Sequence, residues 1–339
     1  MRIAVDAMGG DHAPDVVIQG AIEAARLLSE NVEIVLVGNG PILREKLARL
    51  AYRYRPRSVV FHEASQSIEM GESPAQALRK KRDSSIVVGL GMVKSGQAQA
   101  FVSAGNTGAV MACAIFEVGR LAGVSRPAIG SIMPNQKGVS LLLDAGANAD
   151  CKPINLLQFG IMGSLYFQHI IKGSRPRVGL LSIGEESTKG NELTVEAHAL
   201  LAKSHLNFVG NVEGKDILKG AADVIICDGF VGNVILKFAE SIVGMVSSTI
   251  REKVAANLRS KIGAFLLTPA FAKFKRRFDY EEYGGAPLLG IDGACIICHG
   301  GSSPKAIRNA INLAVRVVNS GINQQIKYQL QEMSDHVPA

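Results

Sequence analysis

The sequence of 339 residues contains no tryptophan, and its aromatic residues make up only 5% of the chain. Proteins that hold single-stranded nucleic acid stack the bases on aromatic side chains, so this scarcity argues against a nucleic-acid partner. Long hydrophobic runs are also missing, since none approaches the ~18 residues of a membrane-spanning helix. The first apolar run stops at Asp6, where the hydrophobic region of a secretory signal would continue. We therefore expect a protein that is soluble or, at most, peripheral to a membrane.

Cysteine is scarce as well. The five cysteines are odd in number and lie mostly inside apolar runs, which fits buried free thiols in a reducing compartment better than a disulfide framework. Cys295-Ile-Ile-Cys298-His299 matches the haem-attachment pattern C-x-x-C-H, but it continues a predicted buried strand, so we expect no haem. No close-spaced ligand pattern such as H-E-x-x-H occurs, and we expect neither a metal nor a cofactor.

Glycine and positive charge are what the chain has in excess. Its 36 glycines stand singly or in pairs between apolar runs, and its net charge is +7 with a pI near 9.2. Such a charge favours acidic partners, whether phosphate ligands, an anionic membrane face, an acidic protein or nucleic acid. Charge alone does not choose among these partners.

Short apolar runs alternate with helical periodicity along nearly the whole chain. Because these runs are almost continuous in Val, Ile and Leu, they predict a largely parallel sheet covered on both faces, an α/β/α three-layer sandwich. No linker-like segment or internal repeat divides the sequence, so we expect a single domain over residues 1–339. The predicted strands are Ile3–Val5, Val32–Val37, Ser58–Phe61, Ala98–Ser103, Ile129–Met133, Val139–Leu143, Val178–Ile183, Asn207–Gly210, Asp223–Cys227 and Ala294–Cys298.

One long helix differs from the rest. From Val234 to about Leu258 the apolar residues follow a single stripe, and at ~1.5 Å per residue this helix reaches roughly 37 Å. It either projects within a helical hairpin at about 234–280 and pairs with a second copy, or covers a large monomer. Phe265, Leu266, Leu267 and Phe271 follow, beside the basic cluster Lys273, Lys275, Arg276 and Arg277. These residues alone favour a buried hairpin tip over a membrane contact.

The stretch from Asp6 to Pro14 follows the first predicted strand and precedes a predicted helix. Gly9 and Gly10 let the backbone approach a ligand closely, and a helix N-terminus attracts anions. An anion site and a tight turn without a ligand both fit this pattern.

Five further turns share this character. Polar residues and glycines at the carboxyl ends of parallel strands form the ligand sites of open α/β sheets, so we expect all six turns to meet at one edge. Ordinary loop chemistry is the alternative. The five turns are Ser103-Ala-Gly105-Asn106-Thr107, Asp144-Ala-Gly146-Ala-Asn148, Gly184-Glu185-Glu186-Ser187-Thr188-Lys189-Gly190-Asn191, Asp228-Gly229-Phe230-Val231-Gly232-Asn233 and His299-Gly300-Gly301-Ser302-Ser303.

Several better-known motifs fail on inspection. Gly38-Asn-Gly40 begins a dinucleotide-like fingerprint, but Leu43 stands where a third small residue is needed, which excludes NAD by this motif. No Walker sequence occurs. Phe101 replaces the first glycine of a nucleophile elbow around Ser103, so Ser103 is expected to be a hydrogen-bond donor rather than a nucleophile.

Together these turns resemble the bacterial phosphate acyltransferase family of phospholipid synthesis. The resemblance runs in order through nearly the whole chain and rests on I-A-V-D-A-M-G-G-D-H-A-P, S-A-G-N-T-G-A, L-L-D-A-G-A-N, G-E-E-x-x-K-G-N, C-D-G-F-V-G-N, Y-G-G-A-P-L-L-G-I and H-G-G-S-S. Cys298 and Gly301 depart from the Ala and Ser expected there, which weakens a special role for the His299 turn.

The resemblance implies a Rossmann-like homodimer, related in fold to isopropylmalate dehydrogenases and phosphotransacetylases. It implies transfer of a long-chain acyl group from acyl carrier protein to inorganic phosphate, and a membrane glycerol-3-phosphate acyltransferase would then use the acyl phosphate. It also implies peripheral contact with the inner face of the cell membrane from the cytoplasm, through Phe265, Leu266, Leu267 and Phe271. Arg251, Lys253, Arg259 and Lys261 are the residues expected to dock the acidic carrier.

Phosphate is itself an anionic nucleophile, so this chemistry needs donors and a cation rather than an activated Ser or Cys. We expect the catalytic residues to be Lys189, His12, Asn233 and Asp228, with Lys189 facing phosphate or the oxyanion and His12 protonating the leaving sulfur. The residues expected to bind phosphate or substrate are Asp6, Gly9, Gly10, Asp11, Ser103, Gly105, Asn106, Thr107, Asp144, Asn148, Glu185, Asn191 and His299. A short-chain phosphotransacetylase, a dehydrogenase of the same fold and a membrane scaffold remain as alternatives.

Overall fold

The computed structural model describes residues 1–50, 58–171, 174–255, 258–269, 277 and 279–336. Its strands are β1 (Arg2–Asp6), β2 (Glu33–Gly38), β3 (Val59–Glu63), β4 (Ala100–Ser103), β5 (Ala128–Asn135), β6 (Gly138–Leu143), β7 (Val178–Leu181), β8 (Phe208–Val212), β9 (Val224–Ile226), β10 (Ala286–Leu289) and β11 (Ala294–Ile297). Its α-helices are α1 (Asp15–Leu27), α2 (Gly40–Leu50), α3 (Pro74–Lys80), α4 (Ser85–Lys94), α5 (Thr107–Cys113), α6 (Pro153–Tyr166), α7 (Glu192–Ala202), α8 (Gly214–Ile217), α9 (Gly229–Ala255), α10 (Leu258–Leu266), α12 (Pro304–Ser320) and α13 (Ile322–His336).

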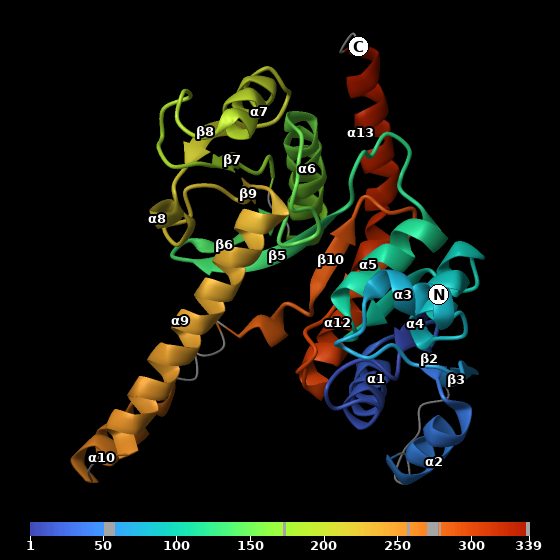
Figure 1. Cartoon of the computed structure of the whole chain (residues 1–339). Helices are drawn as coiled ribbons and strands as arrows, with labels where there is room; N and C mark the ends of the chain where they lie inside the picture. The colour runs from blue at the N-terminus through green and yellow to red at the C-terminus, as the bar shows by residue number, and fades with distance from the viewer. Residues whose placement is uncertain (51–57, 172–173, 256–257, 270–276, 278, 337–339) are drawn as a thin grey trace.

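The strands form one sheet in the order β3-β2-β1-β4-β11-β10-β5-β6-β9-β7-β8. β1, β2, β3, β4 and β11 run parallel to one another, and so do β6, β7, β8 and β9. Between these two groups β10 and β5 pair antiparallel with their neighbours, as do β5 and β6. Figure 1 shows the result as two lobes, joined through β10 and β5.

Helices cover both faces of the sheet, which confirms the predicted α/β fold. In β1 the side chains of Ile3 and Val5 belong to one apolar cluster and Ala4 to the other, as alternation along a strand requires. α1, α6 and α12 contribute to the first cluster, while α4 and α5 contribute to the second.

The direction of the second lobe corrects the expectation that all six turns meet at one edge. Three turns follow β1, β4 and β11, and three follow β6, β7 and β9, which run the opposite way. The reversal comes from the β5–β6 hairpin, whose last pair joins Asn135 to Gly138. Two intervening residues are too few for the crossover that parallel strands need, so the hairpin could have been recognised from its spacing.

α9 leaves the body of the molecule, and α10 packs back against it (Figure 1). By length and composition, residues 229–254 could cross a membrane: an 18-residue window has a mean hydropathy of 1.4 and is 11% buried. The expectation that no run reaches this length is therefore wrong, although one such helix is weak support for a membrane span. Beyond α9, Phe265, Leu266 and Leu267 are 77%, 73% and 54% exposed, which corrects the expectation of a buried tip. Phe271 and the basic residues Lys273, Lys275 and Arg276 lie outside the described residues.

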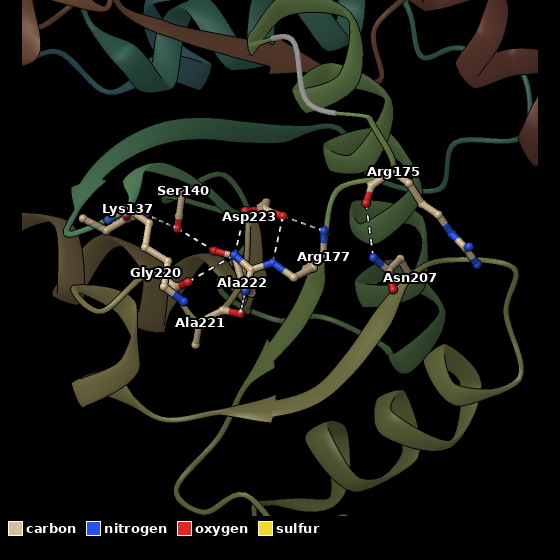
Figure 2. A network of polar contacts seen from close by, with 10 residues as sticks. Lys137, Ser140, Arg175, Arg177, Asn207, Gly220, Ala221, Ala222 and Asp223 are labelled. Atoms are coloured by element: carbon tan, nitrogen blue, oxygen red, sulfur yellow. Dashed lines mark hydrogen bonds and ion pairs between the residues drawn. The ribbon is translucent and has the colours of Figure 1, made fainter.

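A polar network lies in the second lobe where β7 and β9 begin, at the ends of these strands opposite the turns (Figure 2). The guanidinium of Arg177 donates to Asp223 from Nη2 at 2.9 Å and from Nε at 3.1 Å, and to the carbonyl oxygen of Ala221 at 2.8 Å. Burial alone would raise the pKa of Asp223, but the Arg177 contacts hold it below its ordinary value. The starts of β7 and β9 are thereby tied together.

Candidate active site

The first lobe joins the β1 and β4 turns through a buried carboxylate. The hydroxyl of Ser103 donates to Oδ2 of Asp6 at 2.7 Å, and both residues are 1% exposed. The backbone N–H of Gly105 donates to Ser103 Oγ at 3.0 Å, and that of Met8 donates to Asp6 Oδ1 at 3.1 Å. Burial raises the pKa of the Asp6 carboxyl, against the opposing effect of these donors and of the Ser85 hydroxyl. Asp6 therefore organises both turns from inside the protein.

Ser103 and Asn106, which the sequence analysis expects to bind phosphate, donate in this structure to groups of the protein. A serine hydroxyl has one hydrogen, and that of Ser103 already points at Asp6. Asn106 caps α5 by accepting from the backbone N–H of Ala109 at 3.0 Å, while its Nδ2 donates to the carbonyl oxygens of Met70 and Glu72, each at 3.0 Å. Both side chains are committed to structure. Thr107, on the first turn of α5, is exposed.

The β1 and β11 turns meet at a narrow gap that has no room for a water molecule. The backbone N–H of Asp11 donates to the carbonyl oxygen of Gly300 at 2.9 Å, and Gly9, Gly10, His12 and Ser302 line the space around this contact. Asp11, His12 and His299 are exposed, and Nδ1 of His299 accepts from the N–H of Gly301 at 3.1 Å.

Ser302 belongs to the His299–Ser303 turn and lines this gap, but it is not among the residues expected to bind phosphate or substrate. Its side chain is 4% exposed, and its Oγ has no hydrogen-bond partner among the described residues. A buried hydroxyl without a partner is rare in folded proteins, and it often marks a functional position. Its signal in the sequence is its place in the H-G-G-S-S turn, just before the N-cap of α12.

In the second lobe Asp144 organises the turn after β6. Its Oδ1 accepts from the backbone N–H groups of Ile129, Gly146 and Ala147 at 3.1, 3.1 and 2.9 Å. Its Oδ2 accepts from the backbone and the side-chain amide of Asn148 at 2.7 and 2.8 Å. Burial raises the pKa of the Asp144 carboxyl, and these donors oppose the rise. Asp144 and Asn148 thus hold the turn, as Asp6 and Ser103 do in the first lobe.

The first turn of α9 lies directly on the Asp144 turn. The N–H of Gly229 donates to the carbonyl oxygen of Asn148 at 2.7 Å, and a Cβ at Gly232 would stand 1.9 Å from the carbonyl oxygen of Asp144. The glycines of C-D-G-F-V-G-N therefore permit close packing. Asp228 accepts from the N–H of Val231 at 2.9 Å, and Asn233 lies beside Gly146.

The turn after β7, residues 182–191, contains Lys189, the cation expected to face phosphate or the oxyanion. Lys189 is exposed and has no ion-pair partner within 4.0 Å among the described side chains. Glu185 is exposed too, while Asn191 caps α7 through the N–H of Thr194 at 3.0 Å. Next to this turn lies a cleft of about 430 Å³, lined by residues 149–151, Asn191 with Leu193, and Asp228 with Phe230 and Val231.

The two lobes contact each other near these turns. Ala109 and Val110 of α5 belong to one apolar cluster with Ala145, and Ala147 and Leu236 pack against that cluster. The helix that follows the Ser103 turn thus shares its packing with the Asp144 turn and with α9. The residues of the predicted site are thus divided between the two lobes, which contact each other through α5.

The described residues contain no group of three or more His, Cys, Asp and Glu side chains that could hold a metal ion. All five cysteines are free, and burial raises the pKa of the Cys113 and Cys298 thiols to about 12 and that of Cys151 to about 11. Thiols with such pKa values are poor nucleophiles at neutral pH. Hydrogen-bond donors and the exposed cation Lys189 are therefore what the described residues of the candidate site offer, rather than a reactive thiol.

The comparisons with known proteins agree with this geometry. A family model described as "Fatty acid synthesis protein" matches residues 1–325. The phosphate acyltransferase of Geobacter sulfurreducens is 49% identical over 331 residues, which cover 98% of this chain and 94% of that protein. That of Heliobacterium modesticaldum is 50% identical over 338 residues, covering 100% and 98%. This chain belongs to the phosphate acyltransferase family.

Membership of the phosphate acyltransferase family confirms the resemblance carried by the six turns. Solved phosphotransacetylases share the fold: a protein from Streptococcus pyogenes superposes with a TM-score of 0.62, and the EutD protein from Staphylococcus aureus with 0.59, each at 15% identity over 94% of both chains. These structures support the fold assignment alone, because their sequences are so different. A phosphate acyltransferase is an acyltransferase, and the nucleophile that it needs is supplied by a substrate.

Proposed function

We propose that this chain transfers a long-chain acyl group from acyl carrier protein to inorganic phosphate and releases acyl phosphate. The proposal rests on one observation: Lys189 is an exposed cation without an ion-pair partner among the described residues. It lies two residues before Asn191, which lines the 430 Å³ cleft. A cation left uncompensated beside a cleft is suited to attract an anionic substrate.

The reaction joins an oxygen of hydrogen phosphate to the carbonyl carbon of the thioester. The carbonyl oxygen becomes an oxyanion in the tetrahedral intermediate, and the carbon–sulfur bond then breaks. The proton carried by hydrogen phosphate ends on the leaving sulfur, so one dianion is converted to another and the products are acyl phosphate and the carrier thiol. The protein has to hold phosphate against the carbonyl group, stabilise the oxyanion and relay one proton.

Lys189 is proposed to bind phosphate or the oxyanion, and exposed His12 to relay the proton. Removal of a single oxyanion donor costs about 3 kcal/mol, or roughly 100-fold in rate. Asp6 and Asp144 each accept several hydrogen bonds from inside the protein, which supports a positioning role for these two carboxylates. Asn233, beside Gly146, is proposed to orient the donors of the Asp144 turn.

The acyl carrier protein and a second copy of the chain are proposed to use the projecting helices. Arg251, Arg259 and Lys261 are exposed, which suits an acidic carrier; Lys253 is exposed too, but lies 3.6 Å from Glu252. On α9, Phe230, Val234, Phe238 and Met245 are 54–66% exposed, and a partner helix in a homodimer would cover them.

We propose further that the tip contacts the cytoplasmic face of the cell membrane, where a glycerol-3-phosphate acyltransferase would receive the product. Phe265, Leu266 and Leu267 support this proposal because they are apolar and largely exposed. Replacing Leu266 and Leu267 together by Glu should abolish co-sedimentation with anionic liposomes. Unchanged co-sedimentation would contradict a membrane role for the tip.

The function is tested with purified protein, phosphate and palmitoyl carrier protein, with acyl phosphate trapped by hydroxylamine as the hydroxamate. We expect hydroxamate to form only when phosphate is present. A parallel reaction with acetyl-CoA separates the two candidate activities. Product from acetyl-CoA alone would favour a short-chain phosphotransacetylase, and no phosphate-dependent product from either donor would contradict the proposal.

A further inference from the structure

The turn that carries Lys189 is exposed, yet its backbone is held from the neighbouring strand. Asn211 lies on β8 and is 8% exposed, and its Nδ2 donates to the carbonyl oxygen of Glu186 at 2.8 Å. The same oxygen accepts from the backbone N–H of Lys189 at 3.0 Å. One carbonyl group therefore joins a buried amide to the backbone of Lys189.

The orientation of the Asn211 amide is fixed on its other side by His198 of α7. A carbonyl oxygen only accepts, so the amide nitrogen of Asn211 must face Glu186 and its Oδ1 must face Nδ1 of His198, 2.9 Å away. Neutral His198 then carries its hydrogen on Nδ1. Phe208 packs edge-on against this imidazole, with ring centroids 5.1 Å apart.

Lys189 is also held through its carbonyl group, which accepts from the hydroxyl of Ser182 at 2.9 Å. Both backbone polar groups of Lys189 are thus engaged, one by Ser182 directly and the other through Glu186 and Asn211. We propose that Asn211, oriented by His198, is a positioning residue that fixes the backbone of Lys189 for acyl transfer. This inference rests on the role proposed above for Lys189.

Asn211→Asp tests the inference because it keeps the size of the side chain and replaces the donor by an oxygen. That oxygen would repel the carbonyl group of Glu186 and release the turn. Asn207→Asp is the matched control: Asn207 immediately precedes β8, and its Nδ2 also donates to a backbone carbonyl, that of Arg175, at 3.1 Å (Figure 2). Asn207 lies at the opposite end of the strand, so this control makes the same chemical change far from Lys189.

We expect Asn211→Asp to reduce acyl transfer by roughly 10- to 100-fold, the scale of a misplaced catalytic group, and Asn207→Asp to leave it unchanged. Asn211→Asp should change the same kinetic parameter, kcat or KM for phosphate, that Lys189→Gln changes. The double variant Lys189→Gln/Asn211→Asp should be no slower than Lys189→Gln alone, because both changes act through one group. Additive losses would overturn the inference.

Two measurements apply whatever the activity proves to be. Hydrogen exchange at the backbone amide of Lys189 should accelerate in Asn211→Asp and remain slow in Asn207→Asp. The ¹⁵N spectrum of wild-type His198 should show the hydrogen on Nδ1 in the neutral ring. Unchanged exchange or the opposite tautomer would overturn the inference.

Should Asn211→Asp fail to fold, His198→Phe removes the orienting contact but keeps an aromatic ring against Phe208. It should give a smaller loss in the same kinetic parameter, and wild-type kinetics would count against the inference. A wild-type protein without phosphate-dependent activity would instead contradict the proposed function, while the exchange experiment would still decide the role of Asn211.

Discussion

Ser103 donates its hydroxyl hydrogen to Asp6 at 2.7 Å, across two neighbouring parallel strands and 97 residues of sequence. The N–H of Gly105 in turn donates to Ser103 Oγ at 3.0 Å. The Asp6 carboxylate therefore positions the β4 turn through Ser103, without a direct hydrogen bond to the Gly105 amide. A carboxylate facing a bound phosphate would repel it. The buried arrangement lets Asp6 organise the β1 and β4 turns while its charge is turned away from the surface.

Ser103→Ala removes both of these hydrogen bonds and leaves the Gly105 N–H without its acceptor. We expect the free energy of unfolding to fall by about 3 kcal/mol, since a hydrogen bond to a buried charged group is being lost. Ser248→Ala is the control, because its exposed hydroxyl only donates to a carbonyl of its own helix. Chemical denaturation measures both variants, and equal stabilities would contradict the structural role of Ser103.

Asp6→Asn tests the effect of burial on the Asp6 carboxyl, whose pKa is raised above the ordinary 3.8. Between pH 3.8 and the raised pKa the folded state binds more protons than the unfolded state, so this group lowers stability as the pH rises through that window. Asparagine does not ionise. The stability of Asp6→Asn relative to the wild type should therefore improve with rising pH across the window, as urea denaturation at a series of pH values would show. A difference that is constant or declines with pH would contradict the raised pKa.

Gly232→Ala places a methyl group 1.9 Å from the carbonyl oxygen of Asp144. α9 would have to move away from the turn, and we expect destabilisation of about 3 kcal/mol or more, with loss of activity. Gly244→Ala, farther along the same helix, meets nothing within 4 Å and should stabilise the helix by roughly 1 kcal/mol. Thermal unfolding of the two variants distinguishes close packing from a mere preference for glycine. Equal melting temperatures would contradict close packing at Gly232.

Ser302→Ala removes the buried hydroxyl that has no partner among the described residues. If this hydroxyl contacts no substrate, its removal should raise the free energy of unfolding by about 1 kcal/mol without changing the kinetics. A role toward phosphate would instead raise KM for phosphate, because the hydroxyl lies near Gly10 and His12. We expect the first result, a more stable protein with unchanged kinetics, because the gap beside this hydroxyl has no room for a water molecule. A less stable protein would show that the hydroxyl has a structural partner.

Much of the fold could be predicted from the sequence, because buried strands rich in Val, Ile and Leu are recognisable as apolar runs. Ten of the strands were expected within a few residues of their observed bounds. β10 (Ala286–Leu289) was missed, since Pro287 and the flanking glycines are typical of a turn rather than a strand. β10 pairs antiparallel on both sides and so leaves β5 parallel to β11. The β5–β6 hairpin then reverses the direction of the second lobe, so the predicted single edge was wrong.

The roles of polar side chains were harder to predict. Ser103, Asn106 and Asp144 stand where a ligand site was expected, but their hydrogen bonds go to groups of the protein itself. Sequence spacing does not distinguish a side chain that binds a ligand from one that holds the turn. Asn211 and His198 were not predicted, because they lie outside every glycine turn. Only the folded chain places them near the backbone of the Lys189 turn.

The central claim is that Lys189 supports acyl transfer to phosphate, and one comparison tests it most directly. Acyl phosphate formed from palmitoyl carrier protein and ³²P-labelled phosphate should be measured for the wild type, Lys189→Gln and the control Lys203→Gln, an exposed lysine at the end of α7. We predict wild-type product for Lys203→Gln and a loss of roughly 100-fold or more for Lys189→Gln, with an unchanged melting temperature. Wild-type rates in Lys189→Gln would contradict the account.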